Sequence, residues 1–470
     1  METSSLPSLL WQDIEQSLRK PNGAQKMAEK VLAAIEATRD ANAYRIVNSE
    51  RVLAEAIAAD ERRKVDQSAS PLLGLPVSVK DLFVVEGYDT MAGTPKALDE
   101  YLGGEGPVVR SLRDVNVVVT GKTHTVEFAF GGIGTNPHHP TPINPWDSAQ
   151  ARVPGGSSSG AGVSLWSGTA ALALGSDTAG SVRVPASLNG CIGLKTTHGR
   201  WALDGIAPLC PSLDTAGLLA LDAEIIAEAF KVIDPKISND PTALDRPWPG
   251  TVNGVRIGIL RSGFDETEAG IDKVTEKALK ELEAAGAVLQ DIELPEAADA
   301  LELFKIGGVA GIEFAGLISN RFPEWRDSLD PNVQQRFESL EKATAIEYLR
   351  RLDALAAMQL GAAQRLSQAN VDVIACPAVP ISAPTQQEVA DGARYVNRNM
   401  LALRNTVVGN FLKMSGFTIP CGKDSLNLPV GLMLMANGEA DVFAVGLLLA
   451  VQRVLGRPFD RLGTPPRFNL

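Results

Sequence analysis

The sequence predicts an α/β protein, because short apolar runs alternate with segments of helical periodicity. Between residue 74 and about residue 220, the apolar runs are bounded by glycine and proline and have the length of buried strands. A strand–helix–strand order follows at 255–295, where VRIGILRS, a charged helical segment and VLQDIELP succeed one another. That order favours parallel pairing of the two strands. The 470 residues contain no internal repeat of 20–50 residues.

Each segment is assigned from its own pattern. Residues 5–66 alternate apolar and charged residues at helical spacing, which predicts a helical shell. Helices with many charges are expected over 297–369, and a last amphipathic helix over 443–456. The stretch 234–251, rich in Asp and Pro, is interpreted as a surface loop rather than a domain boundary. Further strands are predicted at 76–85, 115–123, 170–178, 192–197, 371–380 and 428–436.

Composition argues against several classes of function. A formal net charge of -12 and a pI near 5.0 are unlike the clustered basic surface of a nucleic-acid-binding protein. The N-terminal residues lack the basic region and continuous apolar core of a signal peptide, and we find no run of about 18 apolar residues. We therefore expect a cytoplasmic protein with a small-molecule partner, no nucleic acid and no membrane.

Cysteine and histidine are too few and too scattered to suggest a metal centre or a disulfide framework. The cysteines lie far apart and form no CxxC pair, and the histidines form neither HxH nor HExxH. Neither GxxxxGK[ST] nor a full GxGxxG follows a predicted strand. We therefore expect no metal and no cofactor.

Two turns rich in glycine and serine point to a ligand site. VPGGSSSGAG (153–162) alone would be typical of a flexible turn. GSDTAGSVRVPAS (175–187), however, follows directly on the apolar run TAALALG, where a strand end presents backbone N–H groups to a ligand. A serine nucleophile needs a neighbouring base. The best candidate base is Lys80, in the apolar stretch GLPVSVKDLF (74–83).

Other hydrolytic chemistries fit the sequence less well. Gly156–Gly160 satisfies the GxSxG pattern, but that nucleophile elbow needs a later Asp or Glu and then a histidine. The later histidine, His198, precedes most of the predicted sheet. Cys191 could act as a nucleophile, yet a buried structural cysteine in CIGLKTT is favoured.

The order of these motifs resembles the amidase signature family. GGSSSGAG followed by LALGSDTAGSVRVPASLNGCIGLKTTHGR carries the resemblance, which extends to GLPVSVKD, EFAFGGIGTNP…INPW, SLDTAG and LPVGLMLM. It is dense over roughly 70–220 and sparse elsewhere. The resemblance implies a large mixed, mostly buried twisted β-sheet covered by helices on both faces. Residues 1–69 would form an N-terminal helical shell of the same domain, and 70–470 the amidase signature α/β domain.

The resemblance also implies a Ser–cisSer–Lys triad. Ser181 would be the nucleophile, Ser157 the relay preceded by a cis peptide bond, and Lys80 the base. Lys80 can accept a proton only if burial lowers its pKa by several units. The oxyanion hole would be formed by the backbone N–H groups of Thr178, Ala179, Gly180 and Ser181. Supporting or substrate-binding roles fall on Phe130, Gly131, Ser158, Asp177 and Arg183.

The sequence departs from the family pattern at two positions. Ala179 replaces the first of two glycines usual before the nucleophile, which narrows the oxyanion loop by a methyl group. Met433 stands where the family commonly has glutamine, which makes its surroundings more apolar.

The predicted reaction is hydrolysis of the C–N bond of a small neutral aryl or alkyl carboxylic amide. It would proceed through a serine acyl-enzyme and release the acid and an amine or ammonia. Phe128, Phe130 and Ile133 are expected to line an apolar pocket for this substrate. The expected partner is thus a small-molecule amide substrate, and a homodimer is left open.

Other functions stay open at this point. One is the glutaminase component of a glutamyl-tRNA amidotransferase, which releases ammonia from glutamine for a partner protein. Another is a hydrolase of a small urea-type or dicarboxylic amide. The amidotransferase is disfavoured by Leu403, because an acidic residue is expected three positions before Thr406 to hold the substrate amine. A catalytically silent binding protein is disfavoured by the intact triad.

Overall fold

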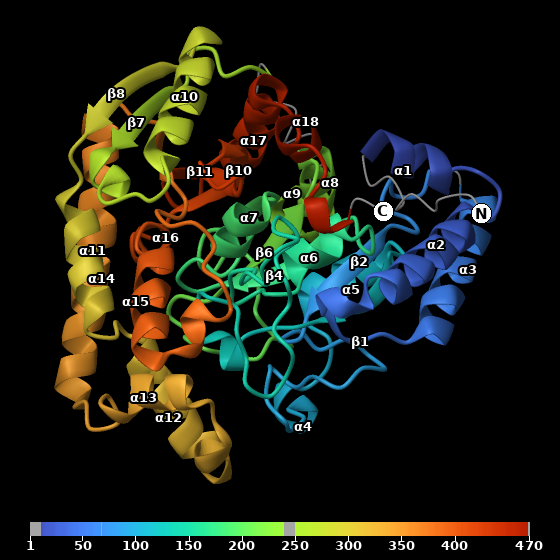
Figure 1. The fold of residues 1–470 in the computed structure, drawn as a ribbon, viewed down its shortest axis with the longest axis horizontal. Coiled ribbons are helices and arrows are strands. Elements are labelled where there is room, and N and C mark those ends of the chain that lie inside the picture. Colours follow the sequence, from blue (N-terminus) through green and yellow to red (C-terminus); the bar gives the residue numbers. More distant parts are fainter. Residues whose placement is uncertain (1–10, 67, 239–249, 469–470) are drawn as a thin grey trace.

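A mixed sheet of eleven strands runs through the computed structural model, which describes residues 11–66, 68–238 and 250–468 (Figure 1). The order of strands in the sheet is β1-β3-β2-β4-β6-β5-β10-β11-β9-β7-β8. The strands are β1 (Tyr44–Ile46), β2 (Pro76–Lys80), β3 (Val118–Thr123), β4 (Leu172–Asp177), β5 (Ile192–Lys195), β6 (Thr215–Ala220), β7 (Arg256–Leu260), β8 (Val288–Ile292), β9 (Val373–Pro377), β10 (Ser415–Lys423) and β11 (Pro429–Ala436).

Parallel and antiparallel pairs share this sheet. β2 runs parallel to β3 and β4, and β7 runs parallel to β8 and β9, which confirms the pairing predicted for 255–295. The ladders among β4, β6, β5, β10, β11 and β9 are antiparallel. Strands β2, β4, β5, β6, β9 and β11 are buried along their whole length. Because both faces of these strands are covered, most of their residues are apolar.

Helices cover the sheet and form two groups at opposite ends of the molecule (Figure 1). The first group is α1 (Trp11–Leu18), α2 (Gly23–Ala37) and α3 (Ser49–Val65). The second is α11 (Pro295–Lys305), α12 (Ala310–Arg321), α13 (Pro331–Glu338), α14 (Ala345–Gln368) and α15 (Gly392–Leu403). The remaining helices are α4 (Asp99–Leu102), α5 (Pro107–Asp114), α6 (Ala161–Trp166), α7 (Arg183–Asn189), α8 (Ala223–Ile233), α9 (Pro235–Ser238), α10 (Ile271–Ala284), α16 (Thr406–Phe411), α17 (Asp441–Leu455) and α18 (Pro458–Leu462).

The large mixed sheet with helical cover confirms the predicted fold class, but three strands were not predicted. β1 has only three residues, and β6 contains Gly217. β10 contains Pro420, which cannot donate to a ladder. Its pairing with β5 covers only Gly416–Thr418, and its register with β11 shifts just after the proline. The helical pattern at the N-terminus holds for α1 to α3, whereas residues 239–249 of the predicted loop lie outside the described residues.

One segment near the C-terminus has the length and mean composition of a membrane-spanning helix, although it is not a continuous apolar run. Asp441–Leu462, which comprises α17 and α18, is long and apolar enough by composition to cross a membrane. In the structure 56% of its apolar window is buried inside the protein, and α17 packs on β10, α8 and α10. More than half of this segment is thus part of the protein core.

Candidate active site

The three predicted motifs meet at the ends of neighbouring strands. Lys80 is the last residue of β2, and β2 lies parallel to β4, which ends at Asp177. Parallel strands bring their carboxyl ends to one edge of the sheet. At this edge the Lys80 Nζ donates to Ser157 Oγ at 2.7 Å and to Ser176 Oγ at 2.9 Å. The Ser158 N–H donates to the Ser181 carbonyl at 3.2 Å, which joins the two serine-rich turns.

Lys80 has the environment that a lysine base requires. Its side chain is fully buried, and burial lowers the pKa of Lys80 to about 7 against the opposing pull of Asp177 and Asp214. A substantial fraction of the amine is therefore neutral near pH 7 and can accept a proton from Ser157. The peptide bond between Gly156 and Ser157 is cis, as the resemblance implied.

The loop before Ser181 has one position where only glycine fits. Gly180 has φ of 136°, and a Cβ there would lie 2.1 Å from Thr406 Oγ1. Ala179 is not among the residues with positive φ, so its methyl group fits this backbone. The Thr406 hydroxyl donates to the Ala179 carbonyl at 2.8 Å and holds the loop from α16.

The expected set of oxyanion donors needs one correction. The Gly180 N–H donates to Asp177 Oδ1 at 2.9 Å, so it is already occupied. The reason is geometric: the carboxylate of Asp177 sits under the turn and accepts from Gly180 and from the Val182 N–H. Of the four predicted donors, the N–H groups of Thr178, Ala179 and Ser181 remain as candidates for the oxyanion hole.

Asp177 and Arg183 form a buried ion pair beneath this loop. Arg183 Nη2 lies 2.9 Å from Asp177 Oδ1, and both side chains are fully buried. Burial alone would raise the pKa of Asp177, but the Arg183 guanidinium holds it well below its usual range. Asn410 donates to Asp177 at 2.9 Å and accepts from Arg183 at 2.5 Å. Met433 is the other departure from the family pattern. Its sulfur accepts a hydrogen bond from Arg183 Nη1 at 3.3 Å.

Sequence reasoning missed several residues of this arrangement. Ser176 lies inside GSDTAGSVRVPAS and Asp214 inside SLDTAG, but neither was predicted as a site residue. The Thr178 hydroxyl donates to Asp214 at 2.5 Å, and burial raises the pKa of Asp214. Asn410 and Thr406 come from α16, and no local pattern marks them as neighbours of residues near 180.

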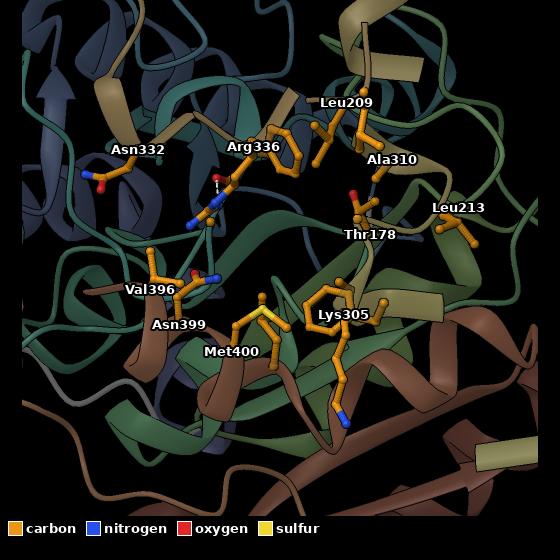
Figure 2. A pocket seen from close by; sticks show the side chains of 18 of the residues that line it. Thr178, Leu209, Leu213, Lys305, Ala310, Asn332, Arg336, Val396, Asn399 and Met400 are labelled. Atoms are coloured by element: carbon orange, nitrogen blue, oxygen red, sulfur yellow. Dashed lines mark hydrogen bonds between the residues drawn. The ribbon is translucent and has the colours of Figure 1, made fainter. Parts of the chain in front are cut away.

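Ser181 is one of the residues that line a cavity of about 370 Å³. Figure 2 shows the side chains around this cavity. Thr178, Ala179 and Ser181 lie on one side of it, and residues of α12, α13 and α15 form other walls. Most of its lining is apolar and includes Phe130, Leu209, Leu213, Phe304, Met400 and Leu403. The cavity could therefore hold a small molecule with an apolar body beside the serine.

Two of the three predicted pocket residues do not line this cavity. Phe130 and its neighbour Gly131 do, but Phe128 and Ile133 are buried elsewhere. The Phe128 ring packs edge-on against Phe314, with centroids 5.4 Å apart. Phe128 has φ of 46°, so the chain reverses here instead of continuing as an extended strand, and of the three predicted residues only Phe130 lines the cavity.

The polar residues of the cavity lie mainly on the helices. Figure 2 shows Arg336 on α13 and Asn399 on α15 on one side, and Thr178 on another. The Arg336 guanidinium donates to the Phe130 carbonyl and, at 3.1 Å, to the Tyr395 hydroxyl. Within the described ranges, no three His, Cys, Asp or Glu side chains are grouped so that they could hold a metal ion.

The chain is similar to proteins of known family along nearly its whole length. The family model described as Amidase matches residues 26–443. The chain is 43% identical to 2-amino-5-chloromuconic acid deaminase from Comamonas testosteroni, over 90% of this chain and 91% of that protein. It is 31% identical to a glutamyl-tRNA(Gln) amidotransferase component from Cupriavidus necator, over 88% of this chain and 90% of that one.

A solved amidase structure superposes with a TM-score of 0.83 at 26% sequence identity. The superposition covers 95% of this chain and 100% of the other. Fold, motif order and sequence similarity therefore agree. The chain belongs to the amidase family and is a hydrolase of carbon–nitrogen bonds other than peptide bonds.

Proposed function

We propose that the chain hydrolyses a small amide through an acyl-enzyme formed on Ser181. The observation that carries this proposal is the buried contact between Lys80 Nζ and Ser157 Oγ at 2.7 Å. It couples a lysine whose pKa burial lowers to about 7 to a serine in the turn that contacts residue 181. A neutral amine held against a hydroxyl is a base that needs no histidine.

The proposed reaction has two halves. Ser181 Oγ attacks the amide carbon, and its proton passes through Ser157 to Lys80 and then to the leaving nitrogen as the C–N bond breaks. Water then attacks the acyl carbon while Lys80 receives its proton through Ser157. As the bond from Ser181 to the acyl group breaks, Lys80 returns this proton through Ser157 to Ser181 Oγ, which restores the free enzyme. The products are a carboxylic acid and an amine or ammonia, with water as the second substrate.

The N–H groups of Thr178, Ala179 and Ser181 are proposed to stabilise the oxyanion of both tetrahedral intermediates. Each such donor contributes on the order of 3 kcal/mol to the transition state. The contacts of Asp177 with the Gly180 and Val182 N–H groups support the idea that this loop is held before substrate arrives. A loop that is already in place loses little free energy when the oxyanion forms.

The apolar lining of the cavity supports a substrate with an aryl or alkyl body. The relationship to 2-amino-5-chloromuconic acid deaminase favours ammonia as the leaving group. The alternative, the glutaminase component of an amidotransferase, is supported by relatives at 31% identity. Leu403 disfavours the amidotransferase function. Its apolar side chain lines the cavity at the position where a carboxylate was expected to hold the amine of glutamine.

The test compares kcat/KM of the isolated chain for benzamide-type amides, aliphatic amides, 2-amino-5-chloromuconate and glutamine, with ammonia release as the common measurement. We expect turnover of at least one small amide without ATP or a second protein, and we expect EDTA to leave it unchanged. Glutamine as the best substrate, or ammonia release only with a partner protein and charged tRNA, would overturn the proposal. A cytoplasmic location and a homodimer stay predictions.

A further inference from the structure

We propose that Arg336 binds a carboxylate group of the substrate, so that the substrate carries a hydrolysable C–N bond at one end and a free carboxylate at the other. This inference rests on the proposed function, since it assigns the substrate of the same cavity. Among the alternatives that the sequence left open, it favours the dicarboxylic half-amides.

The first observation is the charge of the cavity. Among the described residues that line it there are two cations, Lys305 and Arg336, and neither Asp nor Glu. The chain as a whole has a net charge of -12, so a cavity without acidic residues is unlike the rest of the protein. A concave, mostly apolar site that holds cations and no carboxylate favours a ligand with a negative charge.

The second observation separates the two cations. Lys305 is exposed and pairs with Glu302 at 2.7 Å, and Figure 2 shows its amine directed away from the other labelled side chains. Arg336 is partly buried, and no ion pair with a carboxylate is found for it among the described residues. Arg336 is therefore the cation of this cavity whose charge the described part of the protein leaves without a carboxylate partner.

The third observation is that the Arg336 side chain is held in place before any ligand binds. Its guanidinium lies 5.4 Å from the ring centroids of both Phe130 and Tyr395. Its two protein acceptors are the Phe130 carbonyl and the Tyr395 hydroxyl, both neutral. A guanidinium has five N–H donors, so donors remain for the paired oxygens of a carboxylate.

The helix that carries Arg336 is anchored to the same wall of the cavity. The fully buried Glu127 accepts from the Asp330 N–H at 2.7 Å, directly before α13, and it contacts His138 Nε2 at 2.9 Å. Glu127 begins the turn that leads to Phe130. Two links, one through Glu127 and one through Arg336, thus join α13 to the turn, which fixes the guanidinium relative to the cavity wall that Phe130 forms.

A second donor lies on the same side of the cavity. The Asn399 carboxamide oxygen accepts from the Gly132 N–H at 2.8 Å, which leaves its nitrogen as a donor for a ligand. Figure 2 shows Asn399 and Arg336 together, apart from Thr178 of the oxyanion loop. A substrate whose amide lies at the loop would therefore place its other end near Arg336 and Asn399.

The experiment uses matched pairs of amides. The monoamides of four- to six-carbon dicarboxylic acids are each compared with the methyl ester of the same monoamide, which lacks the charge. For the wild-type chain we expect kcat/KM to favour the acid. In Arg336→Met we expect that preference to fall about 100-fold, since hydrogen bonds to charged groups are worth about 1.5–3 kcal/mol. Arg336→Lys should restore only part of it, because lysine lacks the two-pronged geometry.

The control is Lys305→Met, which removes the other cation and should change the preference by less than about threefold. Binding is measured separately by titrating the six-carbon monoamide into Ser181→Ala, with and without Arg336→Met, so that a loss of affinity is seen without turnover. An equal preference for acid and ester in the wild-type chain, or a preference unchanged in Arg336→Met, would overturn the inference.

These results are distinguishable from failure of the proposed function. A neutral fluorophosphonate should label Ser181 in the wild-type chain whatever the substrate charge. Suppose that Ser181 is labelled and the amide bond of the methyl-ester compounds is hydrolysed, but the wild-type chain does not prefer the acids. Then only the role of Arg336 fails. If neither labelling nor hydrolysis of any amide is seen, the proposed function fails as well.

Discussion

Lys80 and Arg336 are the two basic residues to which we assign roles in the proposed reaction, yet their surroundings differ. Lys80 is fully buried at the end of β2, contacts two serine hydroxyls and has its pKa lowered to about 7 by burial. Arg336 is partly buried on α13, keeps two neutral acceptors and faces a cavity. The protein thus buries the amine of Lys80, which lowers its pKa, and leaves the guanidinium of Arg336 beside a cavity.

The regions around these cations differ in the same way. Near Lys80, each charged group of the Asp177–Arg183 pair is buried and has further partners such as Asn410. Near Arg336, the walls come from separate helices whose side chains are apolar or half exposed. We infer that single substitutions around Lys80 abolish the chemistry, whereas those around Arg336 change which substrate is used.

The largest effect is expected at the reacting end. Ser181→Ala and Lys80→Ala should each lower kcat by about 10⁴-fold or more, because the residues of such a unit act together. Mass spectrometry after treatment with a fluorophosphonate should find the adduct on Ser181 and none in Ser181→Ala. The matched control is Ser159→Ala, since the buried Ser159 hydroxyl has no hydrogen-bond partner in the described structure. Labelling that persists in Ser181→Ala would contradict the assignment.

A second large effect concerns stability rather than chemistry. Asp177→Ala leaves the Arg183 guanidinium buried without its carboxylate, which we expect to lower the free energy of unfolding by about 3–5 kcal/mol. Urea unfolding followed by circular dichroism measures this change. The exposed pair of Arg261 and Asp291 is the control, and Asp291→Ala should cost less than about 1 kcal/mol. Similar losses in both variants would show that burial of the pair does not matter.

A smaller effect is expected from pH. The amine of Lys80 must be neutral to accept a proton, so kcat/KM should rise with pH up to about 7, the pKa to which burial lowers Lys80, and level off above it. Initial rates in buffers of constant ionic strength give this profile. The residual activity of Lys80→Ala should lack the acidic limb. If kcat/KM of the wild-type chain falls as the pH rises through 7, Lys80 does not act as the base.

The smallest effect is expected from a substitution of Leu403, in the wall of the cavity. Leu403→Asp adds a carboxylate to a cavity that the described lining leaves without one. We expect it to raise kcat/KM for glutamine about tenfold, by pairing with the substrate amine, and to lower that for a dicarboxylic half-amide. Leu403→Asn, which is similar in size and uncharged, is the control. A variant that loses both activities equally would indicate damage to the wall rather than a change of selectivity.

The sequence could predict the reacting end because its residues lie in contiguous motifs at strand ends. Lys80, Ser157 and Ser181 were proposed together from such motifs, and the structure brings Lys80 into contact with Ser157. The roles of the three remain predictions. Phe128 was wrong as a pocket residue because its positive φ reverses the chain, a property that the apolar pattern of EFAFGG does not reveal.

The place of Arg336 in the cavity could not be predicted in this way. Arg336 lies in the stretch 297–369, which was predicted as helices with many charges. Nothing in the local sequence separates it from Arg326 or Arg350, both of which pair with glutamates. Its position in the cavity depends on how α13 packs against the turn at Glu127. Asn410 is likewise brought to Asp177 by packing alone, from a distant part of the chain.

The order of strands has a consequence for synthesis on the ribosome. β10 and β11 are made late, yet they stand in the middle of the sheet, between β5 and β9. Until residues 415–436 emerge, β5 and β9 have unpaired edges, and exposed strand edges favour association between chains. A chain that stops short of β10 would thus contain both serine motifs, but its sheet would be left as two separate halves. We expect such a chain to aggregate before it could act as an enzyme.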